Sequence, residues 1–287
     1  MNRITIVSPK IPVQYALIVV FLGLAFQLRG QDLKYDPKGN PGKWNFEITP
    51  FFVLPGINGQ VQSERLSEDF QIGPSDFISA LYGAFMLDAE ISKGKFFLSP
   101  SWVYTHNAVE KELWTSEDGT QSISFDPGLK RHILEMKAGM RFRLADDFIL
   151  DPYAGFRYTN YNLFGSVEGI INTDEIDEHA DFWDPIIGIQ AHYYPHPRVP
   201  IELKADLGGF GVGSELTWSA WINSGYAVSP IMDIIAGYAV LENRYETETR
   251  AGNAFGMSSL THGFTMGLRF YLAKRYEDPA VFKKAKQ

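Results

Sequence analysis

Apolar and polar residues alternate one by one along most of the chain beyond residue 43, most clearly in residues 200–226. The apolar positions there share one face and include Ile201, Leu203, Leu207, Leu216 and Trp218. The charged positions Glu202, Lys204 and Asp206 share the other face. Because side chains of a β-strand point alternately to its two faces, this period predicts two strands joined by a glycine-rich bend at 211–214.

The same period predicts ten long strands. They are expected at 44–54, 81–91, 96–106, 133–144, 148–161, 182–194, 199–211, 214–228, 231–245 and 258–272. Most exceed the ~9–11 residues that a tilted strand needs to cross a bilayer. We therefore predict an all-β fold, a closed antiparallel up-and-down transmembrane β-barrel of about ten strands, with eight or twelve as alternatives. Residues 58–64 are interpreted as a hairpin within a loop and 75–79 as a helical turn.

The connections between these strands differ in length at the two ends of the predicted barrel. On the side where the first strand starts they are short, at 92–95, 145–147, 195–198 and 229–230. On the other side four are long and only 211–214 is short, and the long connections 107–130 and 162–181 are acidic. Short periplasmic turns, longer external loops and an even strand number are typical of bacterial outer-membrane barrels.

Alternation also fits a soluble exported β-barrel or sandwich, in which the apolar faces form the core. Three features favour lipid contact instead. Aromatic residues lie near strand ends, as in membrane girdles. Glycines lie on the polar faces. A soluble barrel of this size would also have a wide apolar cavity to fill. The aromatic residues are Trp44, Trp102, Tyr104, Trp183, Tyr193, Trp218 and Tyr226.

With the apolar faces toward lipid, charged side chains of both signs face the lumen. The acidic ones are Glu47, Asp88, Glu90, Glu135, Asp151, Asp184, Glu202, Asp206, Glu215 and Asp233. The basic ones are Lys137, Arg141, Arg143, Arg157, Lys204 and Arg269. Since unpaired buried charges are costly, we expect an ion-pair network that plugs or constricts the lumen. Its expected structural members are Glu135, Lys137, Arg141, Arg157, Glu202, Lys204, Asp206 and Arg269.

The N-terminal segment 1–30 has the composition of a cleaved signal peptide. Arg3 and Lys10 precede the apolar run 13–26, and Gly30 offers a small residue before the cleavage point. A retained anchor is the alternative, although the run is shorter than the ~20 residues of a spanning helix. The expected organisation is a signal peptide 1–30, a periplasmic lead 31–43, the barrel 44–272 and a charged tail 273–287.

Composition excludes several classes of protein. The net charge is -8, whereas nucleic-acid-binding proteins carry a basic patch. The chain has no cysteine, which rules out a disulfide scaffold, a cysteine-ligated metal and an acylated lipoprotein anchor.

Candidate chemistry is sparse. The six histidines show no metal-ligand spacing and no nucleophile motif, so we expect no enzyme activity, metal or cofactor. Asp184 and His192 share a face, but they are eight residues apart on one strand, beyond hydrogen-bond reach at ~3.3 Å per residue. The acidic stretch 174–181 is interpreted as a solvated loop, with cation binding as the alternative. No helix follows the hairpin glycines, which therefore indicate a tight bend rather than a phosphate site. These glycines are Gly208, Gly209, Gly211 and Gly213.

The last expected strand carries Thr265-x-Gly267-x-x-Phe270-x-Leu272, which looks like the C-terminal signal read by the barrel assembly machinery. Here, however, a tail follows the strand. Several segments resemble a broad family of uncharacterised bacterial outer-membrane β-barrel proteins, small OmpA-like or porin-like barrels. They are ADLGGFGVGSELTW (205–218), FWDPIIGIQAHY (182–193), DPYAGFRY (151–158) and IIAGYAVLENRYE (234–246). The first is similar to that family's Gly-Asp-x-Gly-Gly-Phe-Gly-x-Gly-Ser hairpin, with Ala205 in place of the first glycine.

The resemblance implies a fold and a location in the outer membrane, but no activity. The expected partners are outer-membrane lipid and lipopolysaccharide, the assembly machinery during biogenesis, and an unidentified external partner. We expect a structural or interaction role through the external loops. A narrow channel for ions or small solutes, and a hydrolase with Asp and His at the barrel rim, are the alternatives.

Overall fold

A computed structural model describes residues 42–62, 67–108, 111–115, 122–125, 128–168, 173–248 and 254–272. The expected signal peptide, most of the lead and the C-terminal tail lie outside these residues, and so does the acidic connection at 109–110, 116–121 and 126–127. These domain assignments therefore stay predictions.

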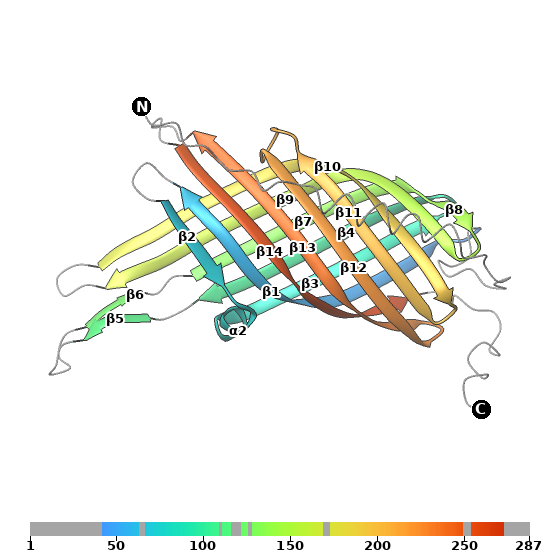
Figure 1. Cartoon of the computed structure of the whole chain (residues 1–287), viewed down its shortest axis with the longest axis horizontal. Helices are drawn as coiled ribbons and strands as arrows, with labels where there is room; N and C mark the ends of the chain where they lie inside the picture. Colours follow the sequence, from blue (N-terminus) through green and yellow to red (C-terminus); the bar gives the residue numbers. More distant parts are fainter. Residues whose placement is uncertain are drawn as a thin grey trace, which may run out of the picture.

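Ten strands form the wall of a closed barrel (Figure 1). Each pairs antiparallel with the next in chain order, and the last pairs with the first. The prediction of a closed antiparallel barrel of ten strands is confirmed. The wall strands are β1 (Asn45–Gln62), β3 (Leu81–Lys93), β4 (Phe96–Ala108), β7 (Gly128–Met140), β9 (Phe148–Glu168), β10 (Thr173–His196), β11 (Val199–Gly209), β12 (Leu216–Ser229), β13 (Met232–Glu248) and β14 (Ala254–Tyr271).

Short elements add to this wall. β2 (Ser67–Ile72) pairs with the end of β1, which matches the hairpin expected inside that loop, and α2 (Pro74–Ser79) matches the expected helical turn. β5 (Lys111–Thr115) and β6 (Ser122–Phe125) pair with each other, and β6 also contacts β9. The strand expected at 133–144 is divided, because β7 ends at Met140 and β8 (Phe142–Ala145) continues the pairing with β9.

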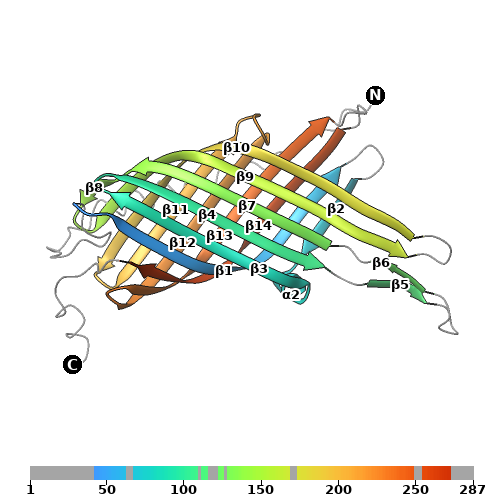
Figure 2. The same cartoon turned by 180° about the vertical axis from the view of Figure 1, so that it is seen from behind.

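The two ends of the barrel differ. At the end that we call the turn end, strands are joined by turns at 94–95, 146–147, 197–198 and 230–231. At the opposite, loop end, β5, β6 and the ends of β9 and β10 project beyond the rest of the wall (Figures 1 and 2). Strands of the front and back walls cross at an angle, as the tilt of a closed barrel requires.

The prediction of a long connection at 162–181 is wrong. β9 and β10 stay paired residue by residue out to Glu168 and Thr173, so most of this acidic stretch is a β-ribbon. Antiparallel pairing satisfies the backbone N–H and C=O groups in water as well as in lipid. The weak strand propensity of Asp and Glu is therefore outweighed by continuation of an existing ladder.

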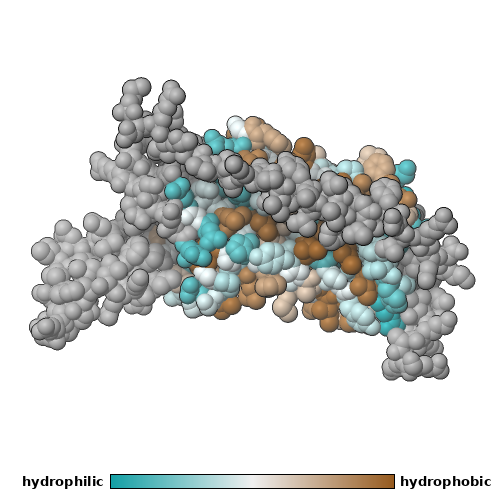
Figure 3. Space-filling model, viewed as in Figure 1, coloured by the Kyte–Doolittle hydropathy of each residue, from teal (hydrophilic) through white to brown (hydrophobic). Residues whose placement is uncertain are grey.

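Side chains divide sharply between the two faces of the wall. Outward-facing Phe264, Met266 and Ile187 are 66%, 62% and 56% exposed, whereas inward-facing Asp151 and Asp184 are 0% exposed. Hydrophobic patches lie on the visible outer wall, and hydrophilic residues gather toward its two ends (Figure 3). An apolar exterior around a charged interior is the reverse of a soluble barrel and is the arrangement of a barrel whose outer wall contacts lipid.

Two residues expected in the lumen are exposed instead. Glu215 has the alternation of an inward residue, but it precedes β12 and lies in the hairpin tip at the loop end. Arg143 lies in β8, where the lumen opens at the turn end, and its guanidinium donates to the backbone oxygen of Asp146.

Within the described residues, no helix has the length and apolar character needed to cross a bilayer.

Candidate functional site

A cluster of ionic side chains, here called the central cluster, crosses the middle of the lumen. Arg157 on β9 is 1% exposed and contacts carboxylates from two other strands. Its Nε donates to Glu135 on β7 at 2.7 Å, and its Nη2 donates to Asp206 on β11 at 2.9 Å. Lys137 on β7 donates to the second oxygen of Glu135 at 2.6 Å. Four charges of alternating sign are thus paired, which offsets the cost of burying each of them.

Hydroxyl groups complete the coordination of this cluster. The remaining Asp206 oxygen accepts hydrogen bonds from Ser219 at 2.7 Å and Tyr153 at 3.2 Å. Arg157 Nη1 donates to Thr217 at 3.0 Å. A Cβ at Gly188 would lie 2.5 Å from the Tyr153 ring, so the absence of a side chain there lets this ring reach Asp206. The cluster is therefore held by side chains from four strands, β7, β9, β11 and β12.

A second set of ionic side chains, here called the turn-end chain, lies closer to the short turns. Arg141 contacts Asp151 at 3.0 Å and Glu90 at 2.7 Å, and Asp151 contacts His192 at 3.2 Å. The chain continues through Glu202, Arg269 and Glu47. Arg269 reaches Glu202 with both terminal nitrogens, at 2.5 Å each, the bidentate arrangement for which a planar guanidinium is suited. Since Glu47 and Glu90 are cross-strand neighbours on β1 and β3, the set extends around the whole lumen.

His192 bridges two carboxylates in this chain. It is 0% exposed, and its Nδ1 lies 3.1 Å from Glu202 while its Nε2 lies 3.2 Å from Asp151. The imidazole ring thus connects Asp151 on β9 with Glu202 on β11 through its two nitrogens.

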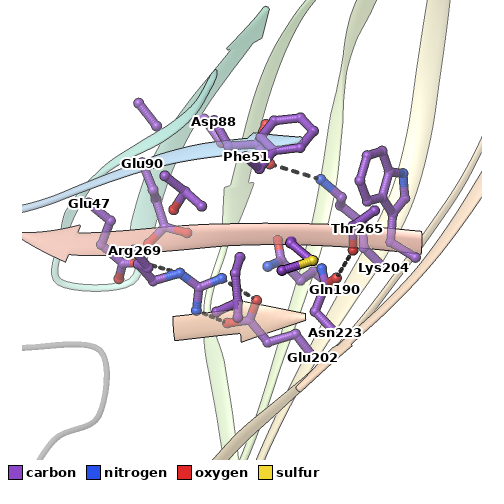
Figure 4. A pocket seen from close by; sticks show the side chains of 16 residues that line it. Glu47, Phe51, Asp88, Glu90, Gln190, Glu202, Lys204, Asn223, Thr265 and Arg269 are labelled. Atoms are coloured by element: carbon purple, nitrogen blue, oxygen red, sulfur yellow. Dashed lines mark hydrogen bonds and ion pairs between the residues drawn. The ribbon is translucent and has the colours of Figure 1, made fainter. Parts of the chain in front are cut away.

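A small cavity of about 60 Å³ lies beside the turn-end chain, whose Glu47, Glu90, Glu202 and Arg269 line it (Figure 4). It is large enough to hold a few water molecules. Lys204 lines it, with its ammonium 3.8 Å from Asp88 and 5.2 Å from the centre of the Trp221 ring. Phe51 packs edge-on against the same tryptophan, so aromatic side chains also occupy the lumen here.

The expected hairpin glycines form the bend between β11 and β12. Gly209 and Gly211 have φ of +85° and +74°, a region that residues with a side chain rarely adopt. Gly208 and Gly213 pack closely instead, since a Cβ at either would meet backbone or side-chain atoms of β10. Asp184 on β10 accepts hydrogen bonds from Ser214 N at 2.7 Å and Ser214 Oγ at 2.9 Å. The hairpin tip is thus fastened to the neighbouring strand.

The eight residues expected to form the lumen network occupy three places. Glu135, Lys137, Arg157 and Asp206 lie in the central cluster, and Arg141, Glu202 and Arg269 lie in the turn-end chain. Lys204 lies beside the cavity, with Asp88 as its carboxylate partner. The bridging role of His192 was not predicted from the sequence, although the alternation that it shares with Asp184 and Gln190 places it on the polar face. Asp184 and His192 do not contact each other: each has a different partner.

The outer wall carries a group of aromatic side chains on β4, β9 and β10. Trp102, Tyr158 and Trp183 lie at about the same height in the strand register. Tyr158 and Trp183 lie 4.8 Å apart between ring centres. Among the described residues, no group of three or more His, Asp or Glu side chains is arranged to hold a metal ion.

No protein-family model matches the sequence, and no curated protein matches it significantly. Solved structures that resemble the fold include the outer membrane protease OmpT from Escherichia coli. The match is 11% identical with a TM-score of 0.47, and it covers 84% of this chain and 99% of that one. The translocator domain of the autotransporter NalP from Neisseria meningitidis matches at 8% identity and a TM-score of 0.40, over 90% and 97% of the two chains. Ail of Yersinia pestis, in complex with a heparin analogue, matches at 12% identity and a TM-score of 0.30, over 77% and 98%.

Proposed function

We propose that this chain is a bacterial outer-membrane β-barrel protein whose lumen is closed by its own ionic side chains. Its role is structural or interaction-based, and the loop end is the contact surface. The observation that carries the proposal is the central cluster, in which Arg157 is almost fully buried between Glu135 and Asp206. A guanidinium held by two carboxylates from different strands, β7 and β11, occupies the space through which a solute would have to pass.

The partners that fit this proposal are lipids around the wall and, at the loop end, a macromolecule outside the cell. The apolar outer wall with its aromatic group suits outer-membrane lipid and lipopolysaccharide. The amphipathic strand β14 suits recognition by the barrel assembly machinery during biogenesis. Among the described residues, two Asp–His pairs are in contact. Asp151 and His192 are fully buried near the turn end and both ring nitrogens of His192 are engaged, which supports a non-enzymatic role for this pair. His179 and Asp181 lie 3.2 Å apart and are exposed toward the loop end, so they are the pair that a hydrolase at the barrel rim would use.

Recordings in planar lipid bilayers test the closed lumen. We expect no steady openings from the wild-type protein. The double variant Arg157→Ser/Glu135→Ser removes one opposite-charge pair from the central cluster and should open discrete conductance steps. The matched control is Arg143→Ser/Glu215→Ser, which makes the same change in charge with two exposed residues and should stay silent. Steady openings of the wild-type protein would disprove the closed lumen.

A narrow channel for ions or small solutes is the second candidate. The cavity beside Lys204 favours it, because the cavity is lined by polar and charged groups such as Asp88, Gln190 and Asn223. If this candidate is correct, the wild-type protein conducts, and Lys204→Met changes its ion selectivity. If the lumen is closed, Lys204→Met has no effect on the recordings.

A further inference from the structure

Arg131 on β7 is buried in the lumen without a carboxylate. It is 7% exposed. Among the described residues, its Nη1 donates a hydrogen bond to Thr261 Oγ1 on β14 at 3.3 Å. Its Nε is buried without any partner. A guanidinium has five N–H donors and never loses its charge in proteins, so most of its donor capacity is unused.

The other basic residues of the lumen wall described above each contact a carboxylate. Lys137 and Arg157 contact Glu135, Arg141 contacts Asp151, Arg269 contacts Glu202, and Lys204 contacts Asp88. Arg131 is the exception among them. Because an isolated buried charge is costly, a cation left without a counter-charge in an otherwise paired lumen indicates that an anion from outside the chain supplies it.

The surroundings of Arg131 are hydroxyl groups rather than carboxylates. Its cross-strand neighbours on the two sides are Thr105 and Tyr161, which are 2% and 7% exposed. Thr159, one inward position from Tyr161 on β9, is 0% exposed and its Oγ1 is also buried without a partner. Two unpaired polar atoms thus face the same part of the lumen. A guanidinium together with hydroxyl donors can bind an anion, and the positive charge of Arg131 disfavours a cation at the same place.

The position of Arg131 decides the side from which an anion enters. Arg131 precedes Glu135 of the central cluster by four residues along β7, toward the loop end, a distance of ~13 Å in an extended strand. The central cluster lies between it and the turn end. We call the lumen segment around Arg131, on the loop-end side of the central cluster, the vestibule.

We propose that this vestibule binds a small carboxylate, with Arg131 as the charged anchor and Thr159 and its hydroxyl neighbours as additional donors. A carboxylate has two oxygens in one plane, which matches the two-pronged donor edge of a guanidinium. A narrow lumen lined by β-strands limits the ligand to a small anion. This inference goes beyond the proposed function, since it holds whether or not the barrel conducts.

Calorimetric titration of the detergent-solubilised protein with sodium acetate tests the proposal. Acetate replaces chloride in the buffer, so that the ionic strength stays constant. We expect saturable binding by the wild-type protein. Binding should weaken at least about tenfold in Arg131→Met, since hydrogen bonds to a charged group are lost. Thr159→Val, which removes one hydroxyl at nearly constant volume, should weaken binding several-fold. Phosphate and sodium chloride titrated in the same way show whether the site prefers a planar oxyanion.

Lys130→Met is the matched control. Lys130 is the next residue along β7 and carries the same charge, but its ammonium lies on the outer wall above the Phe164 ring. This variant should bind acetate like the wild-type protein. If Arg131→Met does not fold, Arg131→Lys keeps the charge but loses the two-pronged edge and should bind acetate more weakly than the wild-type protein. No saturable binding by the wild-type protein, or unchanged binding by the Arg131 variants, overturns the proposal.

Discussion

Single residues of the lumen differ in how many partners depend on them. Arg157 has three partners from three other strands, Glu135, Asp206 and Thr217. Exposed Arg143, by contrast, contacts the backbone at Asp146 beside its own turn. Replacing Arg157 leaves buried Asp206 without its cation and leaves Glu135 with Lys137 alone, whereas the neighbours of exposed Arg143 are accessible to water. An arginine therefore contributes much more to the free energy of unfolding at position 157 than at position 143.

We predict that Arg157→Met lowers the free energy of unfolding by about 3–5 kcal/mol, the usual cost of removing one partner of a buried pair. Adding Asp206→Asn should restore part of the loss, because it removes the carboxylate that is left without a cation. Urea titration of the refolded protein in detergent, followed by tryptophan fluorescence, measures both values. Arg143→Met is the control and should change stability by less than ~0.5 kcal/mol.

The contacts of individual lumen residues could not be predicted from the sequence. Arg157 and Asp206 are 49 residues apart, and β10 lies between their strands. Alternation assigns both to the polar face, but their meeting across the lumen depends on register and strand tilt, which are properties of the closed barrel. The wrong assignment of Glu215 shows the same limit. Its parity is that of an inward residue, yet the strand begins only at Leu216.

The β11–β12 hairpin shows how one element combines local and tertiary requirements. Gly209 and Gly211 both have positive φ, but their surroundings differ. A Cβ at Gly209 would lie 2.6 Å from Ser214 Oγ, whereas a Cβ at Gly211 would meet nothing within 4 Å. Since Ser214 is also held by Asp184, the tip cannot simply move aside at Gly209.

We predict that Gly211→Ala costs about 1–2 kcal/mol of stability, which is the backbone strain alone. Gly209→Ala should cost clearly more, because the steric clash adds to the same strain. Equal losses from the two glycine variants would show that packing against Ser214 is unimportant.

Strands with clear alternation were predictable, and so were their boundaries at the turn end. Their boundaries at the loop end were not. All ten wall strands were expected within a few residues at the turn end, where tight turns such as 146–147 and 197–198 interrupt the pattern. At the loop end, β9 and β10 extend through a stretch rich in Asp and Glu. Such residues have weak strand propensity, and the ladder that overrides this propensity exists only after both strands have paired.

At the scale of the whole molecule, the distribution of apolar side chains separates a membrane barrel from a soluble one. Met266 lies on the outward face of β14 beside Phe52 and Ala236 of the adjoining strands, and it is 62% exposed. In lipid this side chain contacts acyl chains, whereas in a soluble protein it would be in water.

We predict that Met266→Lys destabilises the barrel by about 2–4 kcal/mol in phospholipid bilayers, as expected for a charge near the bilayer midplane. The measurement is a urea titration of folding into vesicles. Met266→Leu serves as the control and should be nearly neutral. A lysine variant as stable as the wild-type protein would mean that the outer wall does not contact lipid.

The pairing of β1 with β14 joins the beginning of the wall to its end, over a register that runs from Glu47 and Tyr271 to Gln62 and Gly256. While the final strand is still missing, the curved sheet has two free edges whose N–H and C=O groups can recruit any extended peptide nearby. A chain that lacks its last strand therefore exposes unpaired backbone groups along both edges of the sheet and is prone to aggregate. Pairing of β14 with β1 removes both edges. Premature truncation by even one hairpin should for this reason yield aggregates rather than a smaller pore.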